Sequence, residues 1–314
     1  MTDWKIWEYQ VPLHHVLPAS GEQRAIRSGY LIQRTINGHS RLTELAPLEG
    51  FHGITKQACL EEFMAYMHHP TSKVERSSVT QLAIDLLEPH PTPAKTIVTN
   101  SLIDLRQISE TLPEPKAHCV KVKMGRRPLD IEIRDLMTLI KRLPSTTLLR
   151  IDANRQWGVD EALACARCVP AHQLAYFEEP LDNPMRYADI PQIPIALDES
   201  MNHPDVHELL ALPNVVAAVL KPSVVGGLNR TRSLIAALKQ YGTQAIISST
   251  FESSLTLWAF AEMADPSLTH GLGTLSWFKH PLFEDSIKFN GHAIQLKPNP
   301  PKRPMAHCLK EVQL

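Results

Sequence analysis

The sequence predicts an α/β protein in which a small α+β unit precedes a (β/α) barrel. Beyond residue 93, short strand-like runs alternate with helical stretches, and this alternation indicates βα units around a parallel sheet. About eight such strands can be counted, which favours a closed barrel over an open doubly wound sheet. No GxGxxG motif follows a strand, so a dinucleotide-binding fold is disfavoured.

The first unit is predicted to be a strand meander followed by two helices. Its elements are strands at residues 4–12 and 24–36 and helices at 56–68 and 77–88. The strands are rich in β-branched and aromatic residues and end at the turn signal Asn37-Gly38, and a serine at the start of the second helix is its predicted N-cap. A proline-containing stretch at 90–95 marks the boundary. We expect residues 1–92 to form an α+β capping domain that 286–314 completes, and 93–285 to form the barrel.

The predicted barrel strands are short and apolar, and helices follow most of them. The strand-like runs are 96–103, 118–124, 147–152, 174–179, 194–199, 215–221, 244–250 and a weak one at 270–276. The helical stretches lie near 129–142, 159–168, 204–211, 228–240 and 253–263. In a parallel barrel the catalytic groups come from the carboxyl ends of the strands, where the βα loops gather. The residues that close each run are therefore the candidates for function.

Composition narrows the class of partner. The 314 residues include 32 Lys and Arg against 33 Asp and Glu, with no basic block that would indicate nucleic acid or an anionic membrane. No apolar run is long enough to span a membrane, and the first residues lack the apolar core of a signal peptide. Five dispersed cysteines fit a reducing compartment; we interpret Cys165 and Cys168 as packing residues of a helix, and the histidines show no HExxH spacing. We expect a cytoplasmic protein that acts on a small molecule.

Three consecutive strands of the predicted barrel end in acidic residues. These ends are Asp152, one of Glu178 and Glu179, and one of Asp198 and Glu199. Carboxylates brought close together repel one another and stay ionised only beside a cation or basic partners. All-oxygen ligation indicates a hard divalent ion, Mg²⁺ above all with Mn²⁺ as the alternative. The competing interpretation is that these acids are solvated or pair with nearby lysines.

Lysines flank this acidic centre in sequence. Lys121 and Lys123 end an earlier strand and share one face because they are two residues apart, while Lys221 ends a later strand. A closed barrel places these strands on opposite sides of the mouth. One lysine can then remove a proton next to a carboxylate while a metal holds the resulting enediolate, and the other adds charge or a proton. Arg150 and Asn154 share the face of Asp152 and point into the same mouth.

At these residues the chain resembles the enolase superfamily. The matching motifs are KVK with Lys121 and Lys123, DAN from Asp152, EEP from Glu178, DES from Asp198, and Lys221 followed by proline. The resemblance implies a barrel of the modified TIM type and a first unit that serves as its capping domain. It also implies that Lys123 and Lys221 are the acid/base pair, and that Asp152, Glu178 and Asp198 hold Mg²⁺.

The resemblance extends to the proteobacterial branch of o-succinylbenzoate synthases and covers nearly the whole chain. It rests on ELAPLEGFHG, RIDANRQW, LKPSVVGGL, AIISSTFESSL and HGLGTL. It implies loss of water from 2-succinyl-6-hydroxy-2,4-cyclohexadiene-1-carboxylate, which gives 2-succinylbenzoate on the route to menaquinone. Lys123 would remove the α-proton, with Lys221 held near the enediolate by a cation–π-like contact.

The same resemblance assigns the substrate contacts. Ser248 and Ser249 match positions near the succinyl carboxylate, and Gly271 matches a backbone contact, although ordinary turn or capping roles explain them as well. Arg150 either neutralises a carboxylate or packs beneath the metal site, and Lys121 is expected to join it as a supporting charge in catalysis. Asn154 is a further candidate for substrate binding. Gly273 stands where related members carry an acid. Loops at 13–22 and 47–53 are expected to close over the substrate.

Two kinds of alternative remain open at this level. N-acylamino acid racemases, dipeptide epimerases and muconate cycloisomerases of the same superfamily also transfer a proton next to a carboxylate, and fold does not select among them. A catalytically silent barrel acting as a binding protein is the other alternative. The partner is expected to be a small carboxylate, with no nucleic acid or membrane, and the protein to be a monomer or small homo-oligomer.

Overall fold

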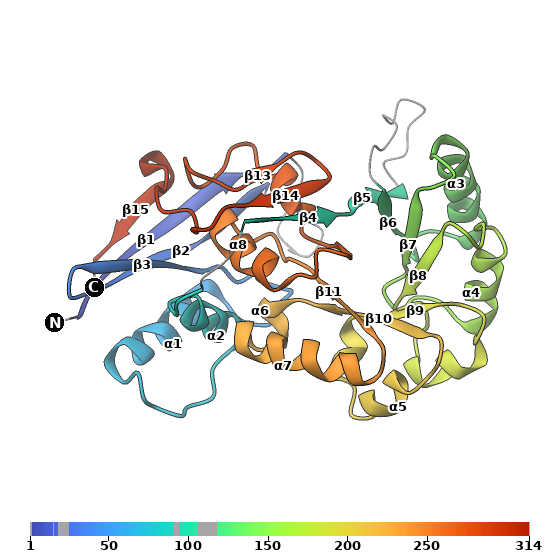
Figure 1. The fold of residues 1–314 in the computed structure, drawn as a ribbon, viewed down its shortest axis with the longest axis horizontal. Coiled ribbons are helices and arrows are strands. Elements are labelled where there is room, and N and C mark those ends of the chain that lie inside the picture. Colours follow the sequence, from blue (N-terminus) through green and yellow to red (C-terminus); the bar gives the residue numbers. More distant parts are fainter. Residues whose placement is uncertain (1, 15, 18–24, 91–93, 106–117, 314) are drawn as a thin grey trace.

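A computed structural model describes residues 2–14, 16–17, 25–90, 94–105 and 118–313. Figure 1 shows an antiparallel sheet with two helices at one end of the molecule and a curled parallel sheet with its covering helices at the other. The two chain termini lie together at the antiparallel end. The predicted boundary stretch and the first predicted capping loop fall partly outside the described residues.

The N-terminal unit is the predicted meander and helix pair. Its antiparallel strands are β1 (Thr2–Pro12), β2 (Ile26–Ile36) and β3 (His39–Leu45), and its helices are α1 (Lys56–His68) and α2 (Ser78–Asp85). The β2–β3 hairpin turns at Asn37 and Gly38, both with positive φ, as a two-residue turn requires. Ser77 is the N-cap of α2, and its hydroxyl accepts a hydrogen bond from the Thr80 amide, so the predicted capping serine is confirmed.

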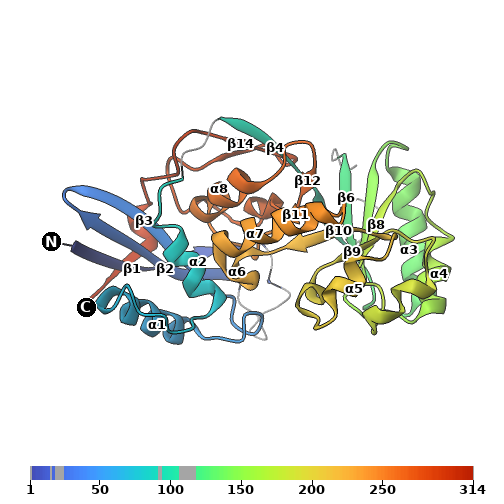
Figure 2. The ribbon, with the colours of Figure 1, turned by 60° about the horizontal axis from the view of Figure 1, so that its bottom comes forward.

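The parallel sheet contains seven strands that neighbour one another in chain order. They are β5 (Ser101–Asp104), β6 (Cys119–Lys123), β7 (Leu148–Asp152), β8 (Leu174–Glu178), β9 (Ile195–Leu197), β10 (Val215–Leu220) and β11 (Gln244–Ile247). Most of the connections contain helices: α3 (Leu129–Arg142), α4 (Val159–Ala166), α5 (Val206–Leu210), α6 (Pro222–Val225) and α7 (Gly227–Gln240), with α8 (Ser254–Met263) after β11. Figure 2 shows the strands curling with helices on their outer side.

Several connections also contain short 3-10 helices of three to six residues. They are η2 (Pro184–Asp189), η3 (Glu199–Asn202), η4 (Gly273–Trp277) and η5 (Ala306–Cys308). The weak strand predicted at 270–276 is wrong over most of its length, because β12 contains only Thr269–His270 and the chain then turns into η4. The two glycines of this segment, Gly271 and Gly273, supply little β-propensity.

A smaller sheet lies between the first and last strands of the parallel sheet. Its order is β12, β4 (Lys95–Thr99), β14 (Ala293–Leu296) and β13 (Lys288–Phe289). The Gly271 amide donates to the Ile247 carbonyl at 2.9 Å, and the Asn100 amide donates to the His270 carbonyl at 3.0 Å. Since β4 runs directly into β5, these bonds link the end of the parallel sheet back to its beginning.

The strands of the C-terminal segment belong to two different sheets. The strands β13 and β14 belong to the small sheet beside β4, whereas β15 (Leu309–Val312) pairs antiparallel with β1. Among the described residues of 286–314, β15 is therefore the part that joins the N-terminal sheet. The exact division of the chain into domains stays a prediction.

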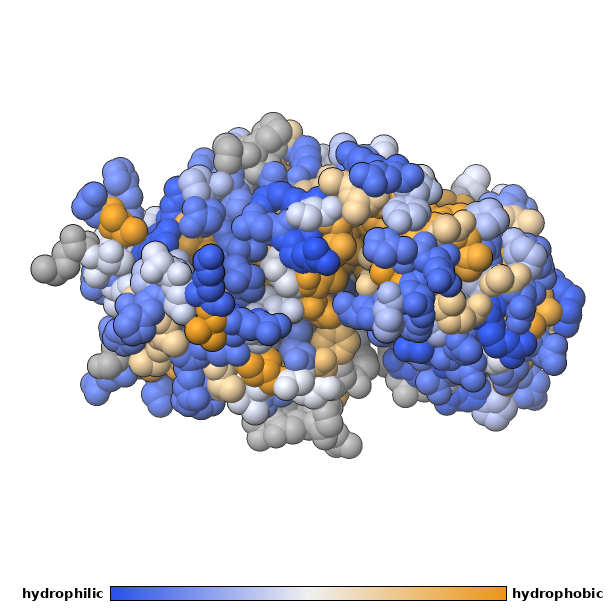
Figure 3. Space-filling model, turned by 90° about the horizontal axis from the view of Figure 1, so that it is seen from below, coloured by the Kyte–Doolittle hydropathy of each residue, from blue (hydrophilic) through white to orange (hydrophobic). Residues whose placement is uncertain are grey.

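The largest apolar core lies between the parallel sheet and its helices, and a small separate cluster of Tyr176, Ala196, Ala217, Val219 and Ile246 lies on the opposite face of the same strands. Two further clusters join the N-terminal unit to the barrel side and fill the space beneath α1 and α2. In the face shown in Figure 3, hydrophilic residues cover most of the surface and hydrophobic residues gather near its middle. Within the described chain, every helix is too short or too polar to cross a bilayer.

Candidate active site

The charged strand ends predicted from the sequence meet at one edge of the parallel sheet. In the strand register Lys123 lies beside Asp152, and Asp152 lies beside Glu178. Alternation along β6 places Val120 and Val122 in the apolar core and turns Lys121 and Lys123 to the opposite face. Burial and alternation together explain why charged side chains occur within otherwise apolar strands.

The ammonium groups and carboxylates of this edge form direct ion pairs. Lys121 Nζ lies 2.7 Å from Asp152 Oδ2 and 2.6 Å from Glu178 Oε1. Lys123 Nζ lies 2.6 Å from the same Asp152 oxygen and donates to Asn154 Oδ1 at 3.1 Å. Both carboxylate side chains are almost fully buried, with 1% and 2% exposure. The structure thus brings together five residues that the sequence singled out.

The second pair comes from β9 and β10. Lys221, the first residue beyond β10, pairs with Asp198, the first residue beyond β9. This pair shares one electrostatic environment with the ion pairs of Lys121 and Lys123. The charge of Asp198 acts on Lys121, and the charge of Glu178 acts on Lys221. The carboxylates of three successive strands and the lysines of β6 and β10 therefore form one cluster.

The protonation of the cluster follows from burial and charge. Burial opposes the charged form of Lys121, but Asp152 and Glu178 outweigh it and raise the pKa of Lys121 well above its usual value. Burial likewise opposes charge on Asp152, yet Lys121 and Lys123 lower the pKa of Asp152. Burial and the Asp152 carboxylate raise the pKa of Glu178 to about 8. Lys121 is therefore held in its charged form, whereas burial and the neighbouring carboxylate oppose ionisation of Glu178.

The donor set fits a divalent cation. Asp152, Glu178 and Asp198 offer only carboxylate oxygens, which suit Mg²⁺ or Mn²⁺ better than softer metals. Asp152 Oδ2 is buried and has close ammonium neighbours but no well-directed hydrogen bond among the described residues. Burial and then the charge of Asp152 oppose ionisation of Glu178 and raise its pKa. A cation among these oxygens would relieve both conditions.

The acidic alternatives left open by the sequence occupy different environments. Glu179, at φ +42°, turns away from the cluster and accepts hydrogen bonds from Tyr187 Oη at 2.9 Å and from the Asp198 and Ser200 amides at 2.7 and 2.8 Å. Glu199 begins η3 and is exposed. The geometry favours Glu178 and Asp198 as the residues that face the lysines.

Arg150 lies on the inner face of the curled sheet, two residues before Asp152. Its guanidinium donates to Asn100 Oδ1 at 3.2 Å and to the Thr269 carbonyl at 2.6 Å, and it stacks 4.9 Å from the Tyr176 ring. Only 5% of Arg150 is exposed. These contacts favour packing beneath the site over the predicted substrate contact.

The predicted substrate-binding group of β11 and β12 is held together by close packing. Ser249 Oγ lies 2.8 Å from Thr274 Oγ1, and both Ser248 and Ser249 reach the Gly271 carbonyl. A Cβ added at Gly271 would lie 2.5 Å from Ser248 Oγ, so this glycine permits a close approach of the two chains. Gly273 packs near the Asn100 carbonyl, 3.0 Å from where its Cβ would lie. No described contact joins this group to the lysine cluster.

Two residues of the N-terminal unit reach the site, and sequence reasoning did not single them out. The Phe51 ring lies 5.5 Å from Lys221 Nζ, although 39% of Phe51 is exposed. His52 accepts a hydrogen bond from the Leu48 amide at its Nδ1, and its buried Nε2 has no partner among the described residues. Burial lowers the pKa of His52 to about 4. The only sequence signal was the expectation that residues 47–53 cover the substrate.

Two buried charged residues hold this unit against the barrel. Arg27 donates to the Phe251 and Pro47 carbonyls, each at 2.9 Å, and thereby joins a barrel loop to the loop that contains Phe51. Glu44 accepts hydrogen bonds from Tyr9 Oη, from the Ser253 amide and hydroxyl, and from Thr256 Oγ1. The covering loop is therefore fixed from both domains.

Fold and site together define the class of protein. Residues 105–301 match the family described as enolase C-terminal domain-like. The chain belongs to the enolase superfamily. It is similar to o-succinylbenzoate synthase from Vibrio cholerae, with 30% identity over 303 residues that cover 87% of this chain and 90% of that protein. The enzyme of the same name from Yersinia pseudotuberculosis is 31% identical over 295 residues, covering 86% and 89%.

Solved structures show the same fold at lower identity. A member of the enolase superfamily from Roseovarius nubinhibens has a TM-score of 0.79 and 16% identity, covering 99% of this chain and 97% of that one. Muconate lactonizing enzyme from Pseudomonas fluorescens has a TM-score of 0.76 and 14% identity, covering 95% and 94%. Dipeptide epimerase from Cytophaga hutchinsonii, complexed with Mg and a dipeptide, has a TM-score of 0.74 and 16% identity, covering 99% and 98%. These structures confirm an α/β architecture with a curled parallel sheet and a capping domain.

Proposed function

We propose that this protein catalyses the Mg²⁺-dependent dehydration of 2-succinyl-6-hydroxy-2,4-cyclohexadiene-1-carboxylate to 2-succinylbenzoate, a step of menaquinone biosynthesis. The observation that carries the proposal is the cluster of Lys123 and Lys221 around three carboxylates, of which Asp152 and Glu178 are buried. The similarity to o-succinylbenzoate synthases over most of both chains supports the choice of substrate. The proposal includes closure of the curled sheet as a modified TIM barrel, supported by the bonds through β12 and β4.

Asp152, Glu178 and Asp198 are the proposed ligands of the cation. When bound, Mg²⁺ supplies positive charge that offsets these carboxylates and the negative charge developing on the substrate carboxylate. Lys121 lies between two of the ligands and adds a fixed positive charge to them. Its role in the proposal is electrostatic support of the cluster.

Lys123 is the proposed base. It acts in this step as a neutral amine, 2.6 Å from the Asp152 carboxylate. It removes the proton α to the substrate carboxylate, and the electron pair of the broken C–H bond moves into that carboxylate. The C–OH bond then breaks, the departing hydroxide takes the proton from Lys123, and the ring becomes aromatic. Hydrogen bonding to Asn154 fixes the position of the Lys123 ammonium.

Lys221 supplies positive charge to the anion formed by proton removal. It stays charged because Asp198 raises the pKa of Lys221 despite the opposing effect of burial. The Phe51 ring covers this ammonium. We further propose that Ser248, Ser249 and the Gly271 backbone bind the succinyl carboxylate, and that the loop containing Phe51 excludes water from the mouth.

The direct test is an assay with the cyclohexadiene substrate. With Mg²⁺ we expect the aromatic product to appear, followed by its ultraviolet absorbance, and we expect the reaction to stop when a chelator removes the metal. Full-length folded protein that yields no aromatic product with either Mg²⁺ or Mn²⁺ would overturn the proposal. A non-catalytic binding protein would give the same negative result, and it would also be insensitive to substitution of Lys123.

Racemisation or epimerisation of N-acyl amino acids and dipeptides is the second candidate, because lysines end both β6 and β10 and can face a substrate carbon from two sides. Racemisation needs both Lys123 and Lys221 to exchange a proton, whereas dehydration needs only positive charge from Lys221. We therefore expect Lys221→Arg to retain measurable dehydration. The second candidate would be favoured if Lys221→Arg lost all dehydration activity and the unmodified enzyme showed racemase activity.

A further inference from the structure

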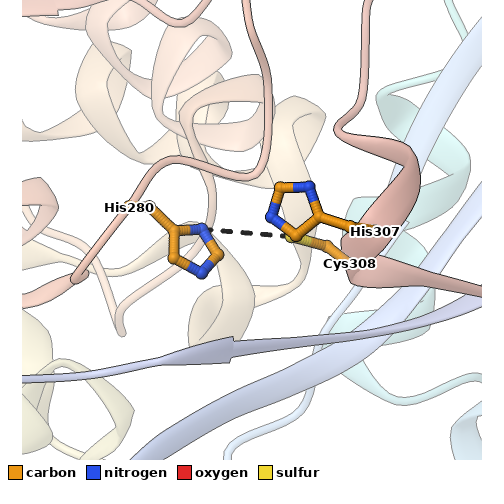
Figure 4. Close-up of side chains that lie close together, drawn as sticks. All are labelled: His280, His307 and Cys308. Carbon is orange, nitrogen blue, oxygen red and sulfur yellow. Dashed lines mark hydrogen bonds between the residues drawn. The ribbon is translucent and has the colours of Figure 1, made fainter.

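A second group of metal-binding side chains lies outside the carboxylate cluster. His280, His307 and Cys308 each offer one ligand atom, and these three atoms lie within 4.8 Å of one another. Cys308 Sγ is 3.9 Å from His280 Nδ1, and the two imidazole rings have centroids 5.4 Å apart. Figure 4 shows both rings and the sulfur turned toward the same small space.

The three residues come from two segments that the fold holds side by side. His280 follows η4, and the Met305 amide just before η5 donates to the Leu282 carbonyl at 2.9 Å. Cys308 is 8% exposed and belongs to the apolar cluster at the junction of the N-terminal unit and the barrel. His307 is exposed, and His280 is partly exposed. The cluster is thus closed by apolar residues on the sulfur side and open to water on the histidine side.

The spacing is close to what a tetrahedral metal requires. Bonds of about 2.3 Å to sulfur and 2.0 Å to nitrogen place tetrahedral ligand atoms about 3.3–3.6 Å apart. The observed sulfur–nitrogen separation exceeds this range by a few tenths of an ångström, which side-chain rotation can supply. One thiolate and two imidazoles favour a borderline or soft ion and disfavour Mg²⁺, whose ligands are oxygens. The two sites are therefore expected to select different metals.

We propose that His280, His307 and Cys308 bind a single Zn²⁺ ion with water in the fourth position. As the sulfur–zinc bond forms, the thiol proton passes to solvent. The ion would join the chain that follows η4 to the start of β15, the strand that pairs with β1. Residues 280–308 connect β12, at the end of the parallel sheet, with the N-terminal sheet. Bound Zn²⁺ would therefore stabilise the junction between the parallel sheet and the N-terminal unit.

The test uses the full-length protein, stripped by chelator and then saturated with Mg²⁺ to occupy the carboxylate site. Addition of Co²⁺, a spectroscopic substitute for Zn²⁺, should produce a near-ultraviolet sulfur-to-cobalt charge-transfer band that saturates at one equivalent. Zn²⁺ should displace the cobalt and raise the melting temperature by about 4 °C at a large excess over its dissociation constant. An all-oxygen site cannot produce the sulfur band, so the band reports a cysteine ligand and excludes the carboxylate site as its source.

Substitutions locate the signal. Cys308→Ser should abolish the band, while the matched control Cys168→Ser, at a half-buried cysteine of another region, should keep it. His307→Asn, at an exposed position that folding tolerates, should weaken cobalt binding at least about tenfold, and His172→Asn should leave it unchanged. Absence of the band in the unmodified protein, or its persistence in Cys308→Ser, would overturn the proposal. Full-strength cobalt binding by a folded His307→Asn variant would overturn it as well.

Discussion

Two adjacent glutamates in the same motif have opposite environments. Glu178 is buried beside Asp152 and pairs with the Lys121 ammonium group, and its pKa rises to about 8 through burial and the Asp152 charge. Glu179 is equally buried but accepts hydrogen bonds from a tyrosine, a serine hydroxyl and two backbone amides. Glu44, between the N-terminal unit and α8, resembles Glu179 in being surrounded by neutral hydrogen-bond donors.

The difference teaches how to distinguish a structural carboxylate from a functional one. A buried carboxylate with directed neutral donors is fully satisfied by the fold, so it fixes the chain and has no oxygen left for a ligand. Glu178 and Asp152 instead have oxygens that face the charged groups of Lys121 and Lys123, whose side chains are 14% and 22% exposed. Their remaining negative charge is what an added cation would neutralise.

Removal of the proposed base should have the largest effect. Lys123→Ala is expected to lower kcat/KM for dehydration by at least about 10³-fold, because no other described amine occupies the same place beside Asn154. Activity should be measured with Mg²⁺ and circular dichroism used to check folding. Lys141→Ala, on the exposed face of α3, is the control. Near-normal turnover by Lys123→Ala would contradict the functional role of the cluster.

Parallel substitution of the two neighbouring glutamates tests the comparison itself. Glu178→Gln should abolish the Mg²⁺-induced rise in melting temperature and most of the activity, yet it should leave the stability of the metal-free protein nearly unchanged because it removes charge repulsion. Glu179→Gln should destabilise the protein by about 2–3 kcal/mol, since an amide group meets donors on both sides. Thermal melts with and without Mg²⁺ measure both effects. The reverse pattern would show that Glu179 is the ligand.

Glu44, the carboxylate between the N-terminal unit and α8, should affect the stability of the protein but not its catalytic activity. Glu44→Gln is expected to lower the free energy of unfolding by about 2 kcal/mol, because the Tyr9 hydroxyl, the Ser253 amide and the Thr256 hydroxyl share its two oxygens. Urea denaturation measures this loss. Glu61→Gln, on the exposed side of α1, provides the matched control. A loss equal to that of the control would mean that the buried contacts contribute little.

The smallest expected effect concerns the pH dependence of stability and comes from a buried histidine. It extends the comparison from carboxylates to a base. His270 accepts from the Ile247 amide through Nδ1, and its Nε2 lies 2.9 Å from the Asp265 carbonyl, so it has two neutral backbone partners. Burial lowers the pKa of His270 to about 4 from the usual 6.5. The unfolded chain therefore binds the proton first, and stability present above pH 6.5 is lost as the pH falls toward 4.

Substitution of this histidine should flatten the pH dependence. In His270→Gln, the slope of unfolding free energy between about pH 6 and 5 should decrease, by at most about 1.4 kcal/mol per pH unit. Urea denaturation at several pH values gives this slope. His52, whose pKa shifts in the same direction, accounts for part of the remaining slope. An unchanged slope in a folded variant would show that His270 is not held neutral.

Much of the fold follows from local sequence patterns. The predicted helices at 56–68 and 129–142 coincide with α1 and α3, and the turn at Asn37-Gly38 and the N-cap at Ser77 are confirmed. These features depend on propensity, capping and turn chemistry within a few residues of chain. The last strand was harder to predict, since β12 is held by its neighbours Ile247, Val98 and Thr99 rather than by its own propensity.

The site was predictable where a charged residue ends an apolar strand. Lys121, Lys123, Asp152 and Lys221 carried this signal in the sequence, and the structure brings them together with their carboxylate partners. Phe51 and His52 were indicated only by the expectation that the loop at 47–53 closes over the substrate, because an aromatic pair in a loop has no periodicity that indicates its partner. The group of His280, His307 and Cys308 was also missed, since its two segments are separated by more than twenty residues without a metal-binding spacing.

The sequence by itself determined the alternation of strands and helices and the charged residues at the strand ends, because both are properties of short stretches of chain. The residues alone left open which of two adjacent acids faces the lysines, and the family resemblance implied Glu178. Only the tertiary structure supplies the physical reason, since a positive φ at Glu179 turns that side chain toward Tyr187 and Ser200. It also decided that Arg150 is enclosed between Asn100, Thr269 and Tyr176. The residues that bury and pair the side chains of a site come from distant segments of the chain. They lie next to one another only once the sheet has curled.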